Sequence, residues 1–563
     1  MIKRIFTLAL LAALGSTVSA QGLLGGHVTG NVQMDGQMSS ADSIIGAQDV
    51  PEKLLMNARA DVLYTNGDFS AGLRFELYQN PLLGFDAKYS GQGLANYFVA
   101  YNGEKLSITA GHFYEQFGSG MILRAYEDRY LGLDIALLGM NVQLRPVPGV
   151  TIKGVSGRQK IFWEYGEGLV RGIDGEVNLN SILGFMKESK FRATLGAGFV
   201  SKYEDDEVIP SSANPEMRLN LPLNVGATSL RADLGYGNWS LQTEYVMKGQ
   251  DPNAIQKVPF GNKFYGYIYH PGQALLMNLV YSQRGFSASL QAKRIDNMGF
   301  KSVRSQSGQM LYINYLPAIT KNHTYAFLSM YPYATQVNGE QGLQADVMYK
   351  FKKGTFLGGE NGLDLHLNGS VVYGLDTTVT GGAGTEGYTV NSGLGETLYG
   401  DVSVEIAKKL SKAVKYTVTY AYQVFNPVVE NEPGDLHHNH IVVADVLWKV
   451  NKGHSLRFEA EWMGSDSHYD ANDPAHSDRR AGDWIMGLVE WNIGTHWFLS
   501  ASDQYAYNDG IGNYYNFTVG YTSGATRLQI GYGKQREGLL CIGGVCRLVP
   551  ASNGLTFSLT TSF

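Results

Sequence analysis

Apolar and polar residues alternate along many short stretches of this chain. Between residues 69 and 77 the odd positions are apolar, and polar residues such as Arg74 and Glu76 fall between them. The same period of two runs through 414–424 and 456–462. Successive side chains of a β-strand point to opposite faces, so each stretch predicts a strand with one apolar and one polar face. A soluble β-sandwich has the same period, so alternation alone does not identify the fold.

The residue types on the two faces distinguish a membrane barrel from a soluble β-sandwich. The apolar face carries Leu, Val, Phe and Tyr, which suits a lipid-facing band. The polar face mixes both signs of charge with Ser, Thr and Gly, which suits a water-filled lumen. We therefore predict a transmembrane antiparallel β-barrel. The charged residues expected on its lumen face include Arg74, Glu76, Lys293, Arg457, Glu459, Glu461 and Lys534.

The connections between the strands alternate between tight and long. Asn66-Gly67-Asp68, Gly237-Asn238 and Ser523-Gly524-Ala525 are turn signals. Longer polar segments, such as 205–222 and 377–396, lie between them. Short periplasmic turns and longer extracellular loops are typical of outer-membrane barrels.

The number of connections predicts the number of strands. Roughly 12 tight turns and 13 longer loops imply about 26 strands, an even number. The segments 180–191, 309–333 and 509–512 could each merge or vanish, so the expected range is about 22 to 26 strands.

Both ends of the chain carry export signals. Lys3 and Arg4 precede an apolar stretch, Ile5 to Leu14, and Val18-Ser19-Ala20 forms an A-x-A-like cleavage site. We expect residues 1–20 to be a signal peptide and residues 21–563 to form one barrel domain without an N-terminal plug. The chain ends in an amphipathic strand that resembles the signal read by the outer-membrane assembly machinery. The residues expected to carry this signal are Phe557, Leu559 and Phe563.

The composition of the chain restricts the classes of molecule that it is expected to bind. The formal net charge is −6 and the isoelectric point is about 6.1, so nucleic-acid binding gains no support. We expect contact with outer-membrane lipids and lipopolysaccharide, and an envelope protein partner is possible. Tyrosine clusters at Tyr312, Tyr315, Tyr331, Tyr333 and Tyr514-Tyr515 are interpreted as interfacial girdle residues.

The sequence gives little evidence for a catalytic site or a cofactor-binding site. Cys541 and Cys546 are five residues apart, and in an exported protein this spacing indicates a small disulfide-closed loop. The acidic or histidine-bearing segments 204–207, 435–440 and 466–478 match no standard metal-site spacing. No nucleophile motif is visible. We expect no enzyme activity, no cofactor and no metal.

The segment 113–138 is the longest break in the alternation and the candidate site. One interpretation is a loop folded into the lumen, where opposed charges set a pore constriction. The other is an Arg–carboxylate network that only packs the loop against the wall. Its charged residues are Glu115, Arg124, Glu127, Asp128, Arg129 and Asp134.

Three stretches of the chain carry a family resemblance: Gly118-Ser-Gly-Met-Ile-Leu-Arg-Ala-Tyr-Glu-Asp-Arg-Tyr-Leu-Gly-Leu-Asp134, Asn314-Tyr-Leu-Pro-Ala-Ile-Thr-Lys-Asn-His-Thr324 and Tyr331-Pro-Tyr-Ala-Thr335. They resemble a Bacteroidota family of uncharacterised outer-membrane β-barrel proteins. The resemblance implies a barrel in the outer membrane and supplies no activity.

Two functions fit these predictions. The first is a porin-like channel for passive passage of small solutes, which the mixed-charge lumen face favours. The second is a non-conducting barrel subunit of a larger outer-membrane assembly or secretion machine. The porin-like channel is the predicted function, and the non-conducting subunit is the alternative. The alternative gains weight because a barrel of this size would enclose a very wide lumen, and an unplugged lumen would breach the membrane barrier.

Overall fold

The computed structural model describes residues 25–211, 216–256, 258–260, 263–306, 311–381, 385–432, 434–470, 472–473, 477–508, 511–542 and 545–563. The expected signal peptide, residues 1–20, lies outside these ranges. The fold is all-β, as predicted, and its main sheet has 24 strands. No helix among the described residues is long and apolar enough to cross a membrane.

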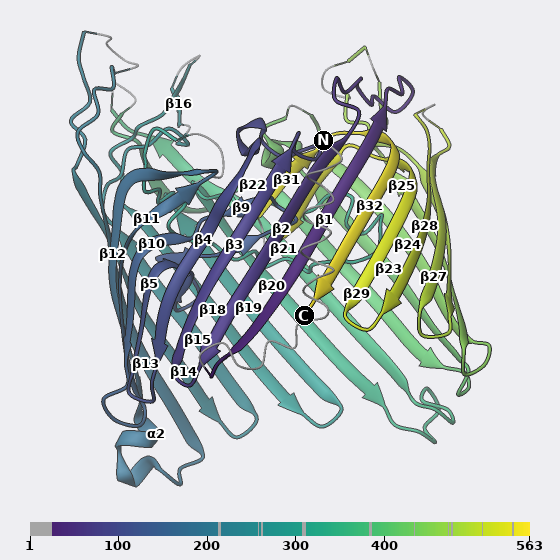
Figure 1. The fold of residues 1–563 in the computed structure, drawn as a ribbon, viewed down its shortest axis with the longest axis horizontal. Coiled ribbons are helices and arrows are strands. Elements are labelled where there is room, and N and C mark those ends of the chain that lie inside the picture. Colours follow the sequence, from purple (N-terminus) through teal and green to yellow (C-terminus); the bar gives the residue numbers. More distant parts are fainter. Residues whose placement is uncertain are drawn as a thin grey trace.

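Each strand of the main sheet pairs antiparallel with its neighbours in the sequence (Figure 1). The strands of the first half are β1 (His27–Ser40), β2 (Leu55–Asn66), β3 (Phe69–Gln79), β4 (Gly91–Asn102), β5 (Leu106–Phe113), β10 (Leu137–Leu144), β11 (Val150–Ile161), β12 (Glu164–Asn178), β13 (Phe191–Tyr203), β14 (Asn224–Tyr236), β15 (Trp239–Lys248), β18 (Gly272–Gln283) and β19 (Phe286–Asp296). Those of the second half are β20 (Gly339–Phe351), β21 (Leu363–Val379), β22 (Tyr388–Lys409), β23 (Val414–Phe425), β24 (His437–Lys449), β25 (His454–Ser465), β26 (Trp484–Ile493), β27 (Trp497–Ala506), β28 (Gly512–Ser523), β29 (Thr526–Gln535) and β32 (Ser552–Ser562).

The first and last strands close the barrel. β1 pairs antiparallel with β32, from Asn31 opposite Ser562 to Ser40 opposite Asn553. Gly30 and Phe563 extend this ladder by exchanging two backbone hydrogen bonds of 2.9 and 3.0 Å. A closed sheet has no unpaired edge, which is the condition for a β-structure to cross a bilayer.

The outer face is apolar, as the alternation predicts. Large side chains on it are exposed in the isolated protein, several of them by more than half, and a lipid bilayer would cover them. Closure and this apolar band place the barrel in an outer membrane. The outward side chains that are more than half exposed include Leu73, Ile173, Leu343, Val402 and Phe517.

Tight turns lie at one end of the barrel and long loops at the other (Figure 1). Gly67, in the turn between β2 and β3, has a φ of +56°, which glycine adopts without strain. The predicted loop 377–396 is shorter than expected, because β21 and β22 pair through Val379 and Tyr388.

The count of about 26 strands was too high by two, although 24 lies within the expected range. Segment 309–333 contributes no strand to the barrel wall over its described residues, 311–333. Instead it belongs to one long connection between β19 and β20. Pro317 and Pro332 lie in this connection, and proline cannot donate to a strand ladder. In the turn between β12 and β13, segment 180–191 holds two short helical turns, α2 (Leu179–Ile182) and η2 (Gly184–Met186).

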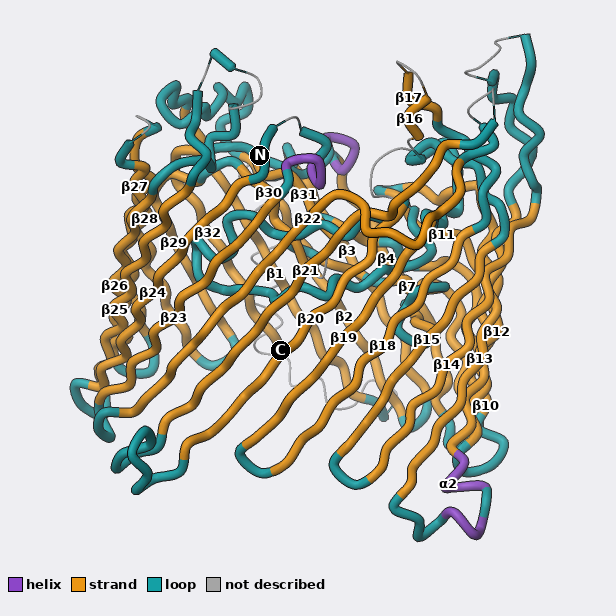
Figure 2. The backbone as a smooth tube through the Cα atoms, turned by 180° about the vertical axis from the view of Figure 1, so that it is seen from behind, coloured by secondary structure: helices purple, strands orange, loops and turns teal. Residues whose placement is uncertain are grey.

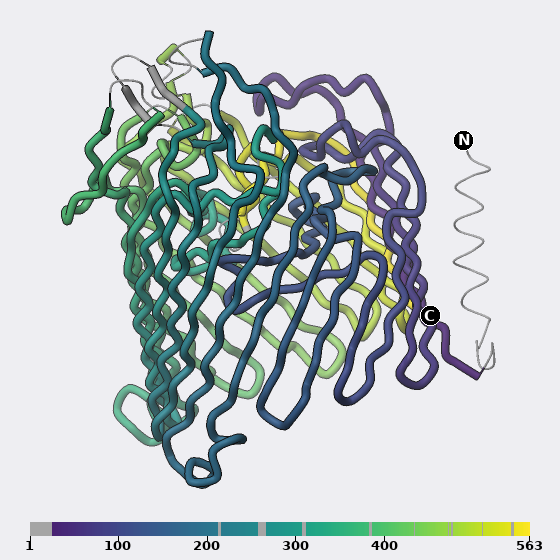
Figure 3. The backbone as a smooth tube through the Cα atoms, turned by 90° about the vertical axis from the view of Figure 1, so that its left-hand side faces the viewer, coloured from purple at the N-terminus to yellow at the C-terminus, as the bar shows by residue number. Residues whose placement is uncertain are grey.

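Two connections fold back into the barrel and are named here lumen loop 1 (residues 114–136, between β5 and β10) and lumen loop 2 (residues 297–306 and 311–338, between β19 and β20). Loop segments cross the interior in Figures 2 and 3. Phe117, Met121 and Ile122 of lumen loop 1 pack in one cluster with Met298 and Phe300 of lumen loop 2. A second cluster packs later residues of lumen loop 2, such as Phe327, against the wall from β21 to β28.

The lumen therefore has two unlike halves. Along β15, the inward-facing Gln242 near the tight turn is exposed, whereas Val246 and Lys248 near the long loops are buried. Along β23, Lys415 is exposed and Gln423 is fully buried. The half of the lumen near the long loops is filled. We call the half near the tight turns the vestibule, where inward side chains such as Gln242 and Lys415 are exposed.

Candidate functional site

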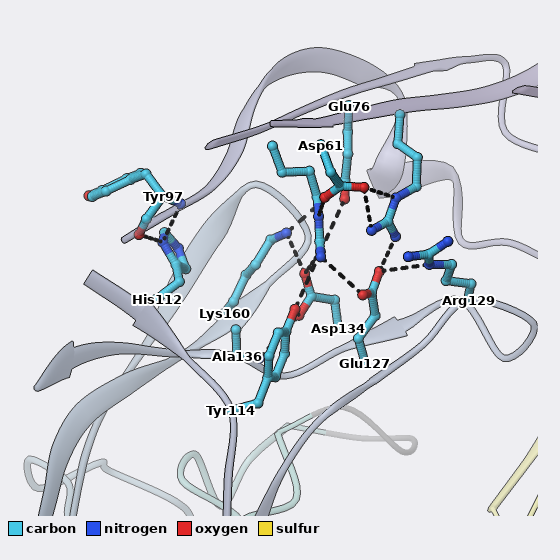
Figure 4. A network of polar contacts seen from close by, with 12 residues as sticks. Asp61, Glu76, Tyr97, His112, Tyr114, Glu127, Arg129, Asp134, Ala136 and Lys160 are labelled. Carbon is cyan, nitrogen blue, oxygen red and sulfur yellow. Dashed lines mark hydrogen bonds and ion pairs between the residues drawn. The ribbon is translucent and has the colours of Figure 1, made fainter. Parts of the chain in front are cut away.

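Charged residues of lumen loop 1 meet the wall in an ion-pair network (Figure 4). Lumen loop 1 contains two small hairpins, β6 (Glu115–Phe117) with β7 (Leu123–Ala125) and β8 (Glu127–Asp128) with β9 (Leu133–Asp134). The second hairpin presents Glu127 and Asp134 to strands β2, β3 and β11. We call the set Arg59, Asp61, Arg74, Glu76, Glu127, Asp134 and Lys160 the lumen network.

Two arginines of the barrel wall form ion pairs with Glu127. Nη2 of Arg74 lies 3.2 Å from Oε2 of Glu127, and Nη1 of Arg59 lies 2.5 Å from Oε1. Asp61 holds both guanidinium groups in place, with 2.7 Å to Arg74 and 2.8 Å to Arg59. Charged hydrogen bonds of this kind are the stronger ones in proteins.

Asp134 is the second carboxylate that fastens lumen loop 1 to the barrel wall. Its carboxylate lies 2.7 Å from Nζ of Lys160 and accepts a hydrogen bond from the hydroxyl of Tyr114 at 3.0 Å. Burial alone would raise the pKa of Asp134, but the positive charges of Lys160 and Arg74 outweigh it and hold the pKa below its usual range. The carboxylate is therefore charged at neutral pH and stays paired.

A β-bulge brings Lys160 to this position. The register of β11 against β12 shifts between Arg158 and Lys160. A bulge places consecutive residues on the same side of a strand. As a result both Gln159 and Lys160 are buried on the lumen side, with 1% and 3% of their surface exposed.

The network is nearly balanced in charge. It holds three cations and four carboxylates, and Arg129 adds a fourth cation at its edge, 3.7 Å from Glu127. Nη1 of Arg129 also donates to Gln33 of β1 at 2.9 Å, while 47% of its side chain stays exposed. This arrangement fastens the loop to the wall, and Arg129 still reaches water.

The remaining predicted residues are divided between other contacts. Glu115 pairs with Lys153 of the wall at 2.8 Å, outside the lumen network. Asp128 accepts the backbone N–H of Leu131 within its own turn. The structure therefore brings Glu127, Asp134 and Arg129 together at the lumen network, whereas Glu115 and Asp128 make separate contacts.

Arg124 joins the two lumen loops. Its guanidinium carbon lies 4.4 Å from the ring centre of Tyr126 and 4.0 Å from that of Tyr315. The backbone N–H of Arg124 donates to the carbonyl of Ile313, and that of Tyr315 donates to Gly120. Arg124 is thus sandwiched between aromatic rings, where a cation–π contact contributes about 0.5–2 kcal/mol.

Polar side chains of the wall hold lumen loop 2. Glu461 of β25 accepts the backbone N–H groups of Ala326 and Phe327, each at 2.9 Å. Lys293 of β19 donates to the carbonyl of Pro317 at 2.7 Å. Further contacts of this kind are Gln159 to Tyr312, Asp401 to His323, Gln423 to Leu328 and Glu340 to Gln336.

Sequence reasoning missed lumen loop 2, and its tyrosines were assigned wrongly. Tyr331 and Tyr333 are buried inside the barrel, with 0% and 4% of their surface exposed, and are not girdle residues. Tyr315 faces Arg124 in the lumen. The available signal was the pair of prolines that interrupts the strand pattern at Pro317 and Pro332.

The last extracellular hairpin closes over the same region. Strands β30 (Gly538–Ile542) and β31 (Val545–Val549) carry Cys541 and Cys546, which form a disulfide. Leu540 and Val545 pack against Leu131, Leu133 and Ile135 of lumen loop 1. Within the described ranges, no group of three or more His, Cys, Asp or Glu side chains is arranged to hold a metal ion.

The terminal residues lie where the barrel closes. Phe563 covers Gly30 so closely that a Cβ at Gly30 would lie 2.2 Å from its ring, and Phe557 covers Gly36 in the same way. Leu559 lies opposite Met34 in the β1–β32 register. Phe557 and Leu559 of the expected assembly signal therefore lie in β32, and Phe563 follows this strand directly at the seam that closes the barrel.

The chain matches one family model and is similar to several solved structures. The model of a family described as "Family of unknown function (DUF6029)" matches residues 1–563. No curated protein matches the chain. Among solved structures, the P pilus usher (PapC) translocation pore is 8% identical with a TM-score of 0.40, over 95% of this chain and 99% of that one.

Two further solved structures are similar to this chain. A point mutant of the ferric enterobactin receptor PfeA from Pseudomonas aeruginosa is 11% identical with a TM-score of 0.43, over 95% of this chain and 80% of that one. The copper transporter OprC is 7% identical with a TM-score of 0.39, over 96% and 80%.

Proposed function

We propose that this chain, which belongs to the family of unknown function DUF6029, is an outer-membrane barrel that its own loops keep closed and that serves as a non-conducting subunit of a larger envelope assembly. The observation that carries the proposal is the filling of the lumen by lumen loops 1 and 2. Inward-facing residues are buried against them or ion-paired to them on strands from β2 through β28.

The contacts of lumen loop 2 make spontaneous opening costly. Removing the loop from the lumen would take Ala326 and Phe327 away from Glu461 and His323 away from Asp401, and it would expose Phe327 and Tyr331 to water. A buried polar group that loses its hydrogen bond costs about 1–3 kcal/mol, and an apolar side chain of this size costs a similar amount to expose. Several such costs would act together, which supports a closed resting state.

A porin-like channel is the second candidate, and the lumen network favours it. A balanced set of charges beside a partly exposed Arg129 is the kind of lining that sets ion selectivity in a pore. Under this function, changing Arg124 and Arg129 to Gln would shift selectivity toward cations, because the neighbouring carboxylates would dominate the local field.

A liposome-swelling assay distinguishes the two functions. The purified protein is reconstituted into liposomes, which are then diluted into isotonic arabinose, glucose or raffinose. A closed barrel predicts the same slow swelling as protein-free liposomes. Swelling rates that rise with the amount of protein and fall with the size of the sugar would favour the porin-like channel instead.

A further inference from the structure

Positive charge is concentrated on three neighbouring tight turns. The turns that join β20 to β21, β22 to β23 and β24 to β25, with the strand ends beside them, carry nine of the 25 lysines in the chain. We call residues 350–364, 408–415 and 449–452 the basic rim. Its lysines are Lys350, Lys352, Lys353, Lys408, Lys409, Lys412, Lys415, Lys449 and Lys452.

The charge of the basic rim opposes that of the whole chain. Glu360 and Asp364 are its only acidic residues, so the rim carries a formal charge of 9 − 2 = +7, whereas the chain carries −6. Eight of the nine lysines are exposed. Asp364 pairs with Lys350 at 2.9 Å, but both side chains are at least 60% exposed, so the pair is weak and the lysine stays available.

Hydrogen bonds join the three turns into one surface. Nζ of Lys408 donates to the carbonyl of Leu357 at 3.3 Å, and Nδ2 of Asn361 donates to Leu410 at 3.1 Å. The backbone N–H of Lys449 donates to Ala413 at 2.7 Å. The lysines therefore act on a partner from one continuous surface.

Strand periodicity aims much of this charge at the vestibule. Asp401 and Ser403 of β22 are buried in the lumen, and Lys409 shares their parity. Lys415 shares the parity of the buried Gln423 on β23, and Lys449 shares that of Val443 on β24. A ligand inside the bilayer would face the opposite side of these strands.

Apolar side chains stand among the lysines. Phe356 is 100% exposed, Leu410 is 58% exposed and Leu357 is 50% exposed. Single exposed apolar residues are common. Here three of them lie on two hydrogen-bonded turns beside a +7 surface, which gives a partner both charge and apolar contact.

We propose that the basic rim docks an acidic segment of a periplasmic protein, one that carries apolar side chains among its carboxylates. The proposal names the partner chemistry for the assembly role and so rests on the proposed function. Charge complementarity of this kind steers association and selects partners. An anionic lipid surface is disfavoured, because Lys409, Lys415 and Lys449 face away from the lipid side.

A defined acidic peptide tests the inference. The full-length protein is placed in nanodiscs of zwitterionic phosphatidylcholine, and fluorescence anisotropy follows a labelled 20-residue peptide of Glu with Leu or Phe at every third position. We expect saturable binding that weakens as salt is raised. The variant K409E/K412E/K452E should bind at least about tenfold more weakly, because three attractions become repulsions.

A matched variant controls for net charge and for folding. K105E/K187E/K190E reverses three exposed lysines on other tight turns of the barrel and should bind the peptide as the wild type does. Heat-modifiable migration confirms that both variants are folded. Absence of saturable binding to the wild type, or equal loss in both variants, would overturn the inference.

A second arm separates lipid from protein as the occupant. Nanodiscs that contain phosphatidylglycerol should leave peptide binding at least half as strong. If they abolish binding to the wild type, the rim takes lipid headgroups and the inference is wrong. If the wild type does not bind the peptide and liposomes that contain it do not swell in sugar, the docking inference alone is wrong. If the wild type binds the peptide and the liposomes do swell, the closed barrel alone is wrong.

Discussion

Arg124 of lumen loop 1 lies against the ring of Tyr315 in lumen loop 2, with 4.0 Å between the guanidinium carbon and the ring centre. Almost two hundred residues separate them in the sequence. Each loop alone would cover only part of the lumen, and this contact, with the backbone bonds beside it, makes them one layer. The closed barrel therefore depends on an interaction between loops as well as on their contacts with the wall.

The variant R124A should loosen this layer. Removing the guanidinium leaves Tyr126 and Tyr315 without the cation between them, at a cost of about 1–2 kcal/mol. Hydrogen exchange of both loops should rise while that of the strands stays unchanged. R192A is the control, since Arg192 is an exposed arginine of β13 that lies outside both lumen loops; equal effects of the two variants would contradict the assignment.

Replacing Glu461 with Ala should free the segment around Phe327. The variant leaves the buried N–H of Phe327 and the half-buried N–H of Ala326 unpaired, which costs about 2–4 kcal/mol if water does not enter. We expect faster exchange of amides 325–331 and a lower midpoint of thermal unfolding. E490A tests specificity, because Glu490 is also an inward-facing glutamate but pairs with Arg457 and Asn492 of the wall. Unchanged hydrogen exchange of amides 325–331 in E461A would contradict the role of Glu461 in holding lumen loop 2.

Cys541 and Cys546 should both resist alkylation in protein taken from intact cells. The variant C541S/C546S should raise exchange in the β30–β31 hairpin and in residues 131–135, which pack against it. Barrel strands should be unaffected, because the hairpin lies outside the main sheet. Mass spectrometry that finds both thiols free would show that the disulfide does not form in the cell.

The sequence predicted the wall of the barrel better than its contents. Period-two patterns such as that of β3 report which face of a strand a side chain occupies, and Leu73 and Arg74 lie on the faces expected. The pattern does not report what covers that face. Gln423 was expected to face water and is fully buried by lumen loop 2.

The candidate site shows the same limit. Local charge density led to Glu127 and Asp134, because opposed charges in a break between strands are visible in a short window. Their partners Arg59 and Lys160 lie on β2 and β11, and only barrel closure and the bulge at Lys160 bring them together. Such pairings depend on the register of distant strands and could not be predicted from one sequence.

Deleting Phe563 should impair assembly. The deletion removes the two backbone bonds to Gly30 and the ring that covers this glycine at the β1–β32 seam. We expect loss of heat-modifiable migration and more degradation in the periplasm, with F557S/F563S at least as severe. V519S, which changes an exposed outward residue of β28 away from the seam, is the control. Normal migration of the deletion variant would rule out an assembly role for this residue.

The closed lumen is tested most directly by current across a planar bilayer. Wild-type protein is compared with a variant in which residues 299–336 of lumen loop 2 are replaced by a short Gly-Ser linker, after heat-modifiable migration has shown that both form barrels. The wild type should show no steady open level, and the variant should show large, long-lived conductance steps. A steady conductance in the wild type that the replacement leaves unchanged would contradict the account.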